Sequence, residues 1–141
     1  MNNRTFYNEV LTEHNLHPAH KHGLGCANRS KDGLNPTCGD EITLHLKLED
    51  GKISDGSFTG SGCAISQASA DMMLDLVIDR TEDEARHYID LFLKMIRGEA
   101  TDEEIEELED AGALKDVSHM PTRAKCATLA WHTLSAIIDK E

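Results

Sequence analysis

Residues 42–59 read ITLHLKLEDGKISDGSFT and contain the clearest strand signal in the chain. Apolar side chains occupy every second position of the first half, at Ile42, Leu44, Leu46 and Leu48. A period of two is typical of a β-strand with one buried face. Asp50-Gly51 favours a tight hairpin turn, so we expect a second strand from Lys52 to about Thr59. The segment therefore predicts an antiparallel β-hairpin.

Helical patterns surround this hairpin. After Cys63 the apolar residues are spaced three and four apart, which is typical of an amphipathic helix. Two capping boxes, Thr81 with Glu84 and Thr101 with Glu104, indicate where two further helices begin. The expected helices cover residues 4–14, 63–80, 81–98, 101–110 and 120–138. A hairpin combined with segregated helices predicts the α+β class.

The remaining segments carry weaker signals. Residues 15–35 are rich in Gly, Pro, Asn and His and are predicted to form a loop or an irregular strand. The acidic segment 102–110 is expected to form an exposed helical excursion, with Ile105 and Leu108 as its anchors. The first helix is expected to have one apolar face, formed by Phe6, Val10 and Leu11.

Length and charge limit the function classes. A chain of 141 residues suits one domain with its own core, so residues 1–141 are expected to form a single domain. The chain has 14 basic and 26 acidic residues, a formal net charge of −12, which argues against a nucleic acid partner. No apolar run approaches the roughly 20 residues of a membrane span, and no signal segment is visible. We expect a cytoplasmic protein without a membrane partner, whose thiols stay reduced.

Four cysteines, at positions 26, 38, 63 and 126, have no C-x-x-C spacing. The fold would therefore have to assemble any metal site from separate elements. Cys38 and Asp40 are two residues apart, so in an extended segment their side chains share a face and could reach one metal ion. The alternative is a turn with a buried cysteine and a capping aspartate. Cys26 has no such companion and is expected only to pack.

Cys63 and Cys126 stand near predicted helix starts. Cys63 follows a Gly-Ser-Gly run, and the N-terminus of a helix lowers the pKa of a thiol. Cys126 lies in the first turns of the last helix, where Arg123 and Lys125 also favour the thiolate. Each cysteine could instead be a small buried residue. Together, three thiolates and one carboxylate suit tetrahedral Zn²⁺, and the two cations would offset the remaining negative charge.

Three stretches of the chain are similar to one known family: NPTCGD at 35–40, GSGCAISQASA at 60–70 and RAKCATLAW at 123–131. With these motifs, and over residues 6–138, the chain resembles the NifU/IscU-like scaffold family of iron–sulfur cluster assembly, and within it the SufU branch. Lys125 indicates the branch, because IscU-type members carry histidine there. The acidic stretch 99–118 resembles an insertion that SufU-type members have before the last helix.

The resemblance implies an α+β fold with helices packed on an antiparallel three-stranded sheet. It also implies a zinc site of Cys38, Asp40, Cys63 and Cys126. The implied partner is a cysteine desulfurase of the SufS type, followed by downstream iron–sulfur assembly proteins. In this family scheme a histidine of the desulfurase replaces Cys38 on zinc, and Cys38 is the catalytic residue that accepts persulfide sulfur. Arg123 matches a position implicated in partner binding.

Three functions remain open at this point. The first is a zinc-dependent persulfide acceptor, which counts as a sulfurtransferase if a carrier is called an enzyme. The second is a scaffold that assembles a transient [2Fe–2S] cluster on the same cysteines, because thiolates bind both metals. The third is a structural zinc domain with a purely binding role, which would unfold without its metal.

Four histidines, His14, His17, His20 and His22, suggest a second metal site. Residues 17–20 read HPAH, where family members usually carry Asn-Pro-Arg-Asn. A polar loop is the favoured interpretation, because Pro18 interrupts the helix and no acid or thiol accompanies the histidines in the sequence.

Overall fold

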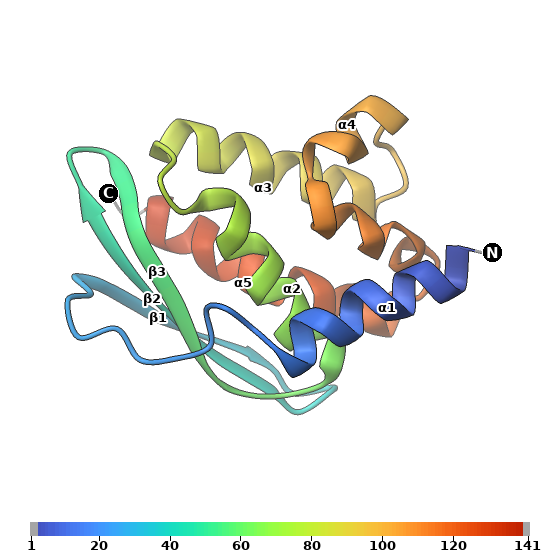
Figure 1. Ribbon diagram of the computed structural model, residues 1–141, viewed down its shortest axis with the longest axis horizontal. Helices are drawn as coiled ribbons and strands as arrows, with labels where there is room; N and C mark the ends of the chain where they lie inside the picture. Colours follow the sequence, from blue (N-terminus) through green and yellow to red (C-terminus); the bar gives the residue numbers. More distant parts are fainter. Residues whose placement is uncertain (1–2, 140–141) are drawn as a thin grey trace.

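The computed structural model describes the backbone of residues 3–139 and the side chains of residues 9–139 (Figure 1). In chain order the elements are α1 (Asn3–Leu16), β1 (Arg29–Asn35), β2 (Asp40–Glu49), β3 (Lys52–Ser61), α2 (Ala64–Val77), α3 (Glu82–Ile96), α4 (Asp102–Glu107), the 3₁₀ helix η1 (Glu109–His119) and α5 (Pro121–Asp139). This arrangement confirms the α+β class. Leu11 on α1 is buried and Val10 half-buried, whereas the side chain of Phe6 lies outside the described residues.

The sheet is antiparallel with the strand order β1-β2-β3, as the resemblance implies. The predicted alternation is present in β2, where Ile42, Leu44 and Leu46 are fully buried. The predicted hairpin turn is also present, with Asp50 and Gly51 both at positive φ. The hairpin prediction is therefore confirmed, and it forms the centre and one edge of the sheet.

β1 is the strand that the sequence marks least clearly. Only Gly33 and Asn35 are buried in this strand, so its sequence has no apolar alternation that would predict it. Backbone pairing with β2 holds it, from Arg29 opposite Leu46 to Asn35 opposite Asp40. α5 packs so closely on β1 that any side chain at Gly33 would overlap Thr133 Oγ1. Tertiary contacts, and not local pattern, therefore make this segment a strand.

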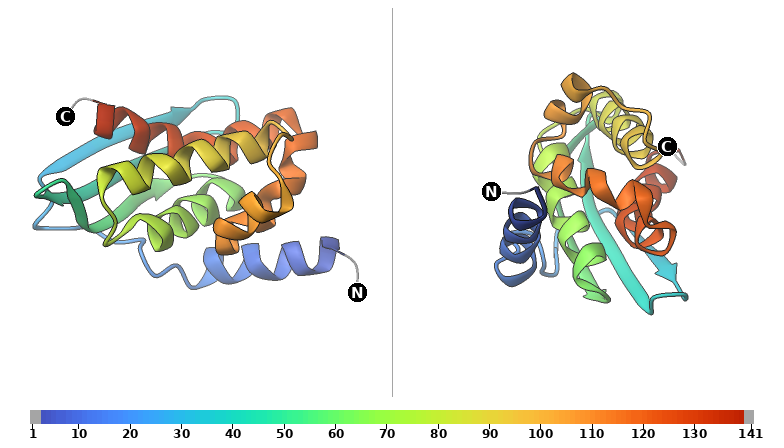
Figure 2. Two further views of the ribbon diagram at one scale, coloured as in Figure 1. Left: turned by 90° about the horizontal axis from the view of Figure 1, so that it is seen from above. Right: turned by 90° about the vertical axis from the view of Figure 1, so that its right-hand side faces the viewer.

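α2 and α5 lie against the sheet, and α1, α3 and η1 pack on these two helices from outside (Figures 1 and 2). In the core, the rings of Trp131 on α5 and Phe92 on α3 stack with their centroids 4.1 Å apart. Trp131 Nε1 donates to Ser69 Oγ on α2 at 2.9 Å, which satisfies the buried indole N–H. No helix within residues 3–139 is long and apolar enough to span a bilayer.

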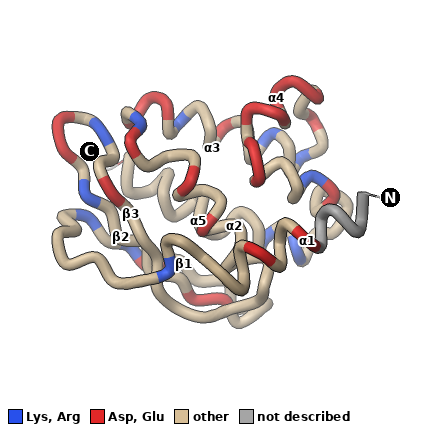
Figure 3. Tube along the Cα trace, viewed as in Figure 1, with Lys and Arg blue, Asp and Glu red and all other residues tan. Residues whose placement is uncertain are grey.

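The acidic segment divides into an exposed and a buried half. Asp and Glu residues gather along α4 (Figure 3), which buries no residue of its own, while Leu108 after it is fully buried as the predicted anchor. η1 then packs Ala111, Leu114 and Val117 into the core. Their spacing of three matches the three residues per turn of a 3₁₀ helix. The exposed excursion is therefore confined to the first half.

Candidate metal centre

Three of the four predicted ligands meet at the start of β2. Cys38 lies in the turn between β1 and β2, Asp40 begins β2, and Cys126 lies in the second turn of α5. The Sγ atoms of Cys38 and Cys126 are 2.9 Å apart, although 88 residues separate them in the chain. The ligand atoms of Cys38, Asp40 and Cys126 all lie within 4.8 Å of one another. All four cysteines are free, since a disulfide needs about 2.05 Å between sulfurs.

The Asp40 carboxylate is buried and held by three donors. Its Oδ1 accepts from the Cys63 backbone N–H at 2.8 Å and from Ser66 Oγ at 3.1 Å. Its Oδ2 accepts from Asn35 Nδ2 at 3.2 Å. Burial alone would raise the pKa of Asp40, but the hydrogen bonds, led by that of Cys63, outweigh it and lower the pKa below its ordinary value. The group is therefore ionised and oriented towards the thiols.

Cys63 stands at the edge of the group. It caps α2, and its Sγ accepts the Ser66 N–H at 3.4 Å. Its Sγ is not among the atoms that lie within 4.8 Å of one another, yet it is near enough to Cys126 to influence that thiol's pKa. Gly62 permits this approach, because a Cβ there would lie 2.5 Å from Asp40 Oδ1 and 2.8 Å from Ser66 Oγ.

Cys126 is buried on α5, only 2% exposed. Burial raises the pKa of its thiol, and hydrogen bonds with Cys38, Asp40 and Cys63 raise it further. The expectation that Arg123 and Lys125 favour its thiolate is therefore wrong for the site without a cation. Acidic groups packed this closely ionise together only when positive charge lies among them. Three thiols and one carboxylate fit Zn²⁺, and equally the thiolate ligation of an iron–sulfur cluster.

Cys26 does not join this group. It is exposed in the segment between α1 and β1, so the expectation that it packs is wrong. The segment runs along the surface, where a small apolar side chain has no core to enter.

Asn35 and Ser66 are the contacting residues that sequence reasoning missed. Both are buried and both donate to Asp40. Each belongs to a motif quoted above, but amide and hydroxyl side chains have no pattern that marks them as supports of a metal ligand. Their role depends on contacts across 5 and 26 residues of sequence.

The polar-loop interpretation of the histidines was wrong in one respect, because acids do accompany them in space. His14 Nδ1 lies 2.7 Å from Asp71 Oδ2, and His20 Nε2 lies 2.7 Å from Asp75 Oδ1. Both acids come from α2, more than 50 residues along the chain. His22 Nδ1 lies 2.7 Å from the Gly23 carbonyl oxygen.

Comparison with known proteins shows the family of this chain. Residues 6–140 match the family described as the NifU-like N-terminal domain. The chain belongs to this family. The iron–sulfur cluster assembly scaffold protein IscU of Streptococcus pyogenes is 40% identical over 134 residues, which cover 95% of this chain and 83% of that protein. The zinc-dependent sulfurtransferase SufU of Bacillus subtilis is 40% identical over 139 residues, 97% of this chain and 92% of that protein.

A solved structure is also similar over almost the whole chain. A candidate scaffold protein for the SUF system of Fervidobacterium islandicum has a TM-score of 0.87 and 32% identity, covering 96% of this chain and 98% of that one. The family confirms the resemblance of the three cysteine motifs and relates this NifU-like domain to iron–sulfur cluster assembly. The names of these two relatives divide between scaffold and sulfurtransferase.

Proposed function

We propose that this NifU-like domain is a zinc-dependent sulfur carrier, which accepts persulfide sulfur on Cys38 from a cysteine desulfurase. The observation that carries the proposal is the meeting of the Cys38, Asp40 and Cys126 ligand atoms within 4.8 Å, with Cys63 beside them. Zn²⁺ prefers four-coordinate sites rich in thiolate. The name of the Bacillus subtilis relative supports the same assignment. The proposal requires reduced thiols, which favours the cytoplasm as compartment.

The proposed cysteine ligands differ in how firmly the surrounding backbone holds them. Cys126 is buried within α5, and Cys63 caps α2. Cys38 is half-buried in a turn, beside Gly39 at φ 69°. Bound Zn²⁺ would keep the thiols deprotonated and so store a nucleophile. Cys38 is the ligand suited to leave, because its turn can move without unwinding a helix.

The transfer step is an exchange between a thiolate and a persulfide. The Cys38 thiolate attacks the terminal sulfur of the persulfide on the desulfurase. A new S–S bond forms at Cys38 while the S–S bond of the donor breaks, and the donor cysteine leaves as a thiolate. The electrons balance without an external oxidant or reductant.

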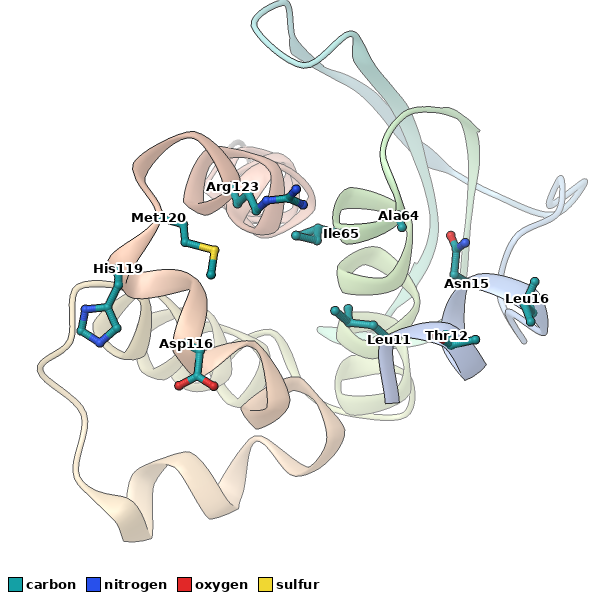
Figure 4. Close-up of a pocket in the computed structure, with 10 residues that line it drawn as sticks. All are labelled: Leu11, Thr12, Asn15, Leu16, Ala64, Ile65, Asp116, His119, Met120 and Arg123. Atoms are coloured by element: carbon teal, nitrogen blue, oxygen red, sulfur yellow. The ribbon is translucent and has the colours of Figure 1, made fainter. Parts of the chain in front are cut away.

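Arg123 is the residue that we propose to engage the desulfurase. It is exposed one turn before Cys126, and it has no hydrogen bond or ion pair to any side chain of residues 9–139. Figure 4 shows it at a cavity of about 690 Å³ between α1, α2, η1 and α5, with its guanidinium directed towards Ile65. A guanidinium exposed at this cavity suits a carboxylate of the docking protein.

Desulfurase turnover of cysteine tests the proposal. The zinc-loaded wild type and the control Cys26→Ala should stimulate turnover and gain the mass of one sulfur atom at Cys38. Cys38→Ala should do neither while its circular dichroism spectrum stays unchanged. Stimulation that persists in Cys38→Ala would refute the assignment.

The alternative function is a scaffold for a [2Fe–2S] cluster, which the name of the Streptococcus pyogenes relative favours. Anaerobic reconstitution with iron and sulfide separates the two functions. The sulfur-carrier proposal expects no stable cluster, in keeping with Lys125 at the position of the IscU-type histidine. A stable chromophore at one cluster per chain, passed intact to an apo-ferredoxin, would establish the scaffold instead.

A further inference from the structure

A second group of metal-binding side chains lies outside the thiol site. His14 on α1 faces Asp71 on α2, and Asp75 lies one turn further along α2. One ligand atom from each of these three residues lies within 4.8 Å of the other two. Asp71 is eight residues beyond Cys63, which is about 12 Å along a helix axis. The two groups are therefore separate.

The donor atoms suit a borderline divalent ion. Imidazole nitrogen and carboxylate oxygen together are ligands for Zn²⁺, Co²⁺, Ni²⁺ and Cu²⁺. Ligand atoms at about 2.0–2.2 Å from one zinc ion lie roughly 3–3.5 Å apart. The present separations, 2.7 Å between His14 Nδ1 and Asp71 Oδ2 and up to 4.8 Å within the group, bracket that value.

Each of the three proposed ligands also contacts a further residue at hydrogen-bond distance. His14 Nε2 lies 2.9 Å from Asp110 Oδ2 on η1, so Nδ1 can bind a metal while Nε2–H donates to a carboxylate. Asp71 Oδ1 accepts the His20 backbone N–H at 2.9 Å, and Asp75 Oδ1 lies 2.7 Å from His20 Nε2. Metal-ligating histidines and carboxylates in proteins are usually supported in this way.

Charge and access also favour a cation. Three carboxylates, those of Asp71, Asp75 and Asp110, lie around this point together with the imidazoles of His14 and His20. The side chains of Asp71 and His14 are 2% and 10% exposed and form a buried wall. The Asp75 side chain is 48% exposed, so an ion can enter from solvent.

We propose that His14, Asp71 and Asp75 form a second site for a borderline divalent cation, with His20 and Asp110 as positioning residues. His14 Nδ1, 2.7 Å from Asp71 Oδ2, is the nitrogen that would bind the ion.

Calorimetric titration with Zn²⁺ tests the proposal on the full chain after the first equivalent has filled the thiol site. We expect a second binding event, weaker than the first. Asp75→Asn should weaken this event at least tenfold and leave the first event unchanged. The matched control Asp90→Asn removes an exposed acid of α3 and should leave both events unchanged.

Co²⁺ identifies where the second equivalent binds. In wild type it should add weak ligand-field bands without new sulfur-to-cobalt charge-transfer bands, because the proposed site has only nitrogen and oxygen donors. A wild type that binds one equivalent only would overturn the proposal. A second event that survives in Asp75→Asn, or that adds thiolate bands, would overturn it as well.

Discussion

Asn35 contacts two of the proposed ligands at once. Its Nδ2 lies 3.2 Å from Asp40 Oδ2 and 3.6 Å from Cys126 Sγ, and its side chain is buried. With Ser66 on the other carboxylate oxygen, it sets the direction in which Asp40 presents its free lone pairs. Single side chains outside the ligand set thus determine the shape of the site.

Replacing Asn35 should therefore weaken metal binding. We expect Asn35→Ala to lower Zn²⁺ affinity about 10- to 100-fold, the usual effect of losing a support of a metal ligand. Competition with a chromophoric chelator measures the affinity. Asn15→Ala, at an exposed position of α1, serves as the control and should keep wild-type affinity. Equal affinity in both variants would contradict the role of Asn35.

At the scale of elements, His14 links α1 to two neighbouring elements. His14 joins Asp71 of α2 and Asp110 of η1, and these hydrogen bonds raise its pKa from 6.5 to about 9 against the opposing effect of burial. A pKa raised by folding means that the folded state binds the proton more tightly than the unfolded chain.

The stability from His14 should consequently depend on pH. This stabilisation is fully present below about pH 6.5 and is lost as the pH rises through about 9. It amounts to about 3 kcal/mol, because each unit by which folding raises the pKa contributes about 1.36 kcal/mol. Urea unfolding of wild type and His14→Gln, with a chelator present, measures the difference across this range. A difference that stays constant from pH 6 to pH 10 would contradict the ionic contact.

The two capping boxes allow the same substitution to be compared at the start of two helices. Thr81 caps α3, which buries Ala85, Ile89 and Phe92, whereas Thr101 caps α4, in which no residue is fully buried and Ile105 only partly. Thr81→Ala should cost about 1 kcal/mol of global stability. Thr101→Ala should loosen α4 and leave global unfolding, followed by Trp131 fluorescence, almost unchanged. Equal losses in the two variants would show that α4 unfolds together with the core.

At the scale of the whole molecule, the site and the core are separate sources of stability. The core joins α2, α3 and α5 to one face of the sheet and contains large, fully buried side chains such as Trp131, Phe92 and Phe58. The proposed ligands lie at the start of β2 and the beginnings of α2 and α5. The fold therefore has its own support without a cation.

Metal removal should leave the chain folded. We expect chelation to lower the melting temperature, because bound metal stabilises by mass action, while the circular dichroism spectrum stays native at room temperature. The function would be lost and regained on adding Zn²⁺. A chain that unfolds completely on chelation would instead match the structural zinc domain, the third function left open by the sequence.

Prediction from the sequence succeeded where the signal is local and failed where it is not. The alternation in β2 and the capping boxes of α3 and α4 depend on neighbours within four residues, and all are present. β1 lacks such a signal because its partner is β2 and its cover is α5. Asp71 was missed beside His14 because 57 residues separate them.

The amino-acid sequence alone determined the class of fold, the hairpin and most helix boundaries, since periodicity and turn chemistry act over a few residues. Only the tertiary structure decided that Cys38 and Cys126 meet across 88 residues, that burial raises the pKa of Cys126 and that Cys26 stays outside. Distance, burial and the balance of neighbouring charges are properties of the packed chain, and no local pattern contains them.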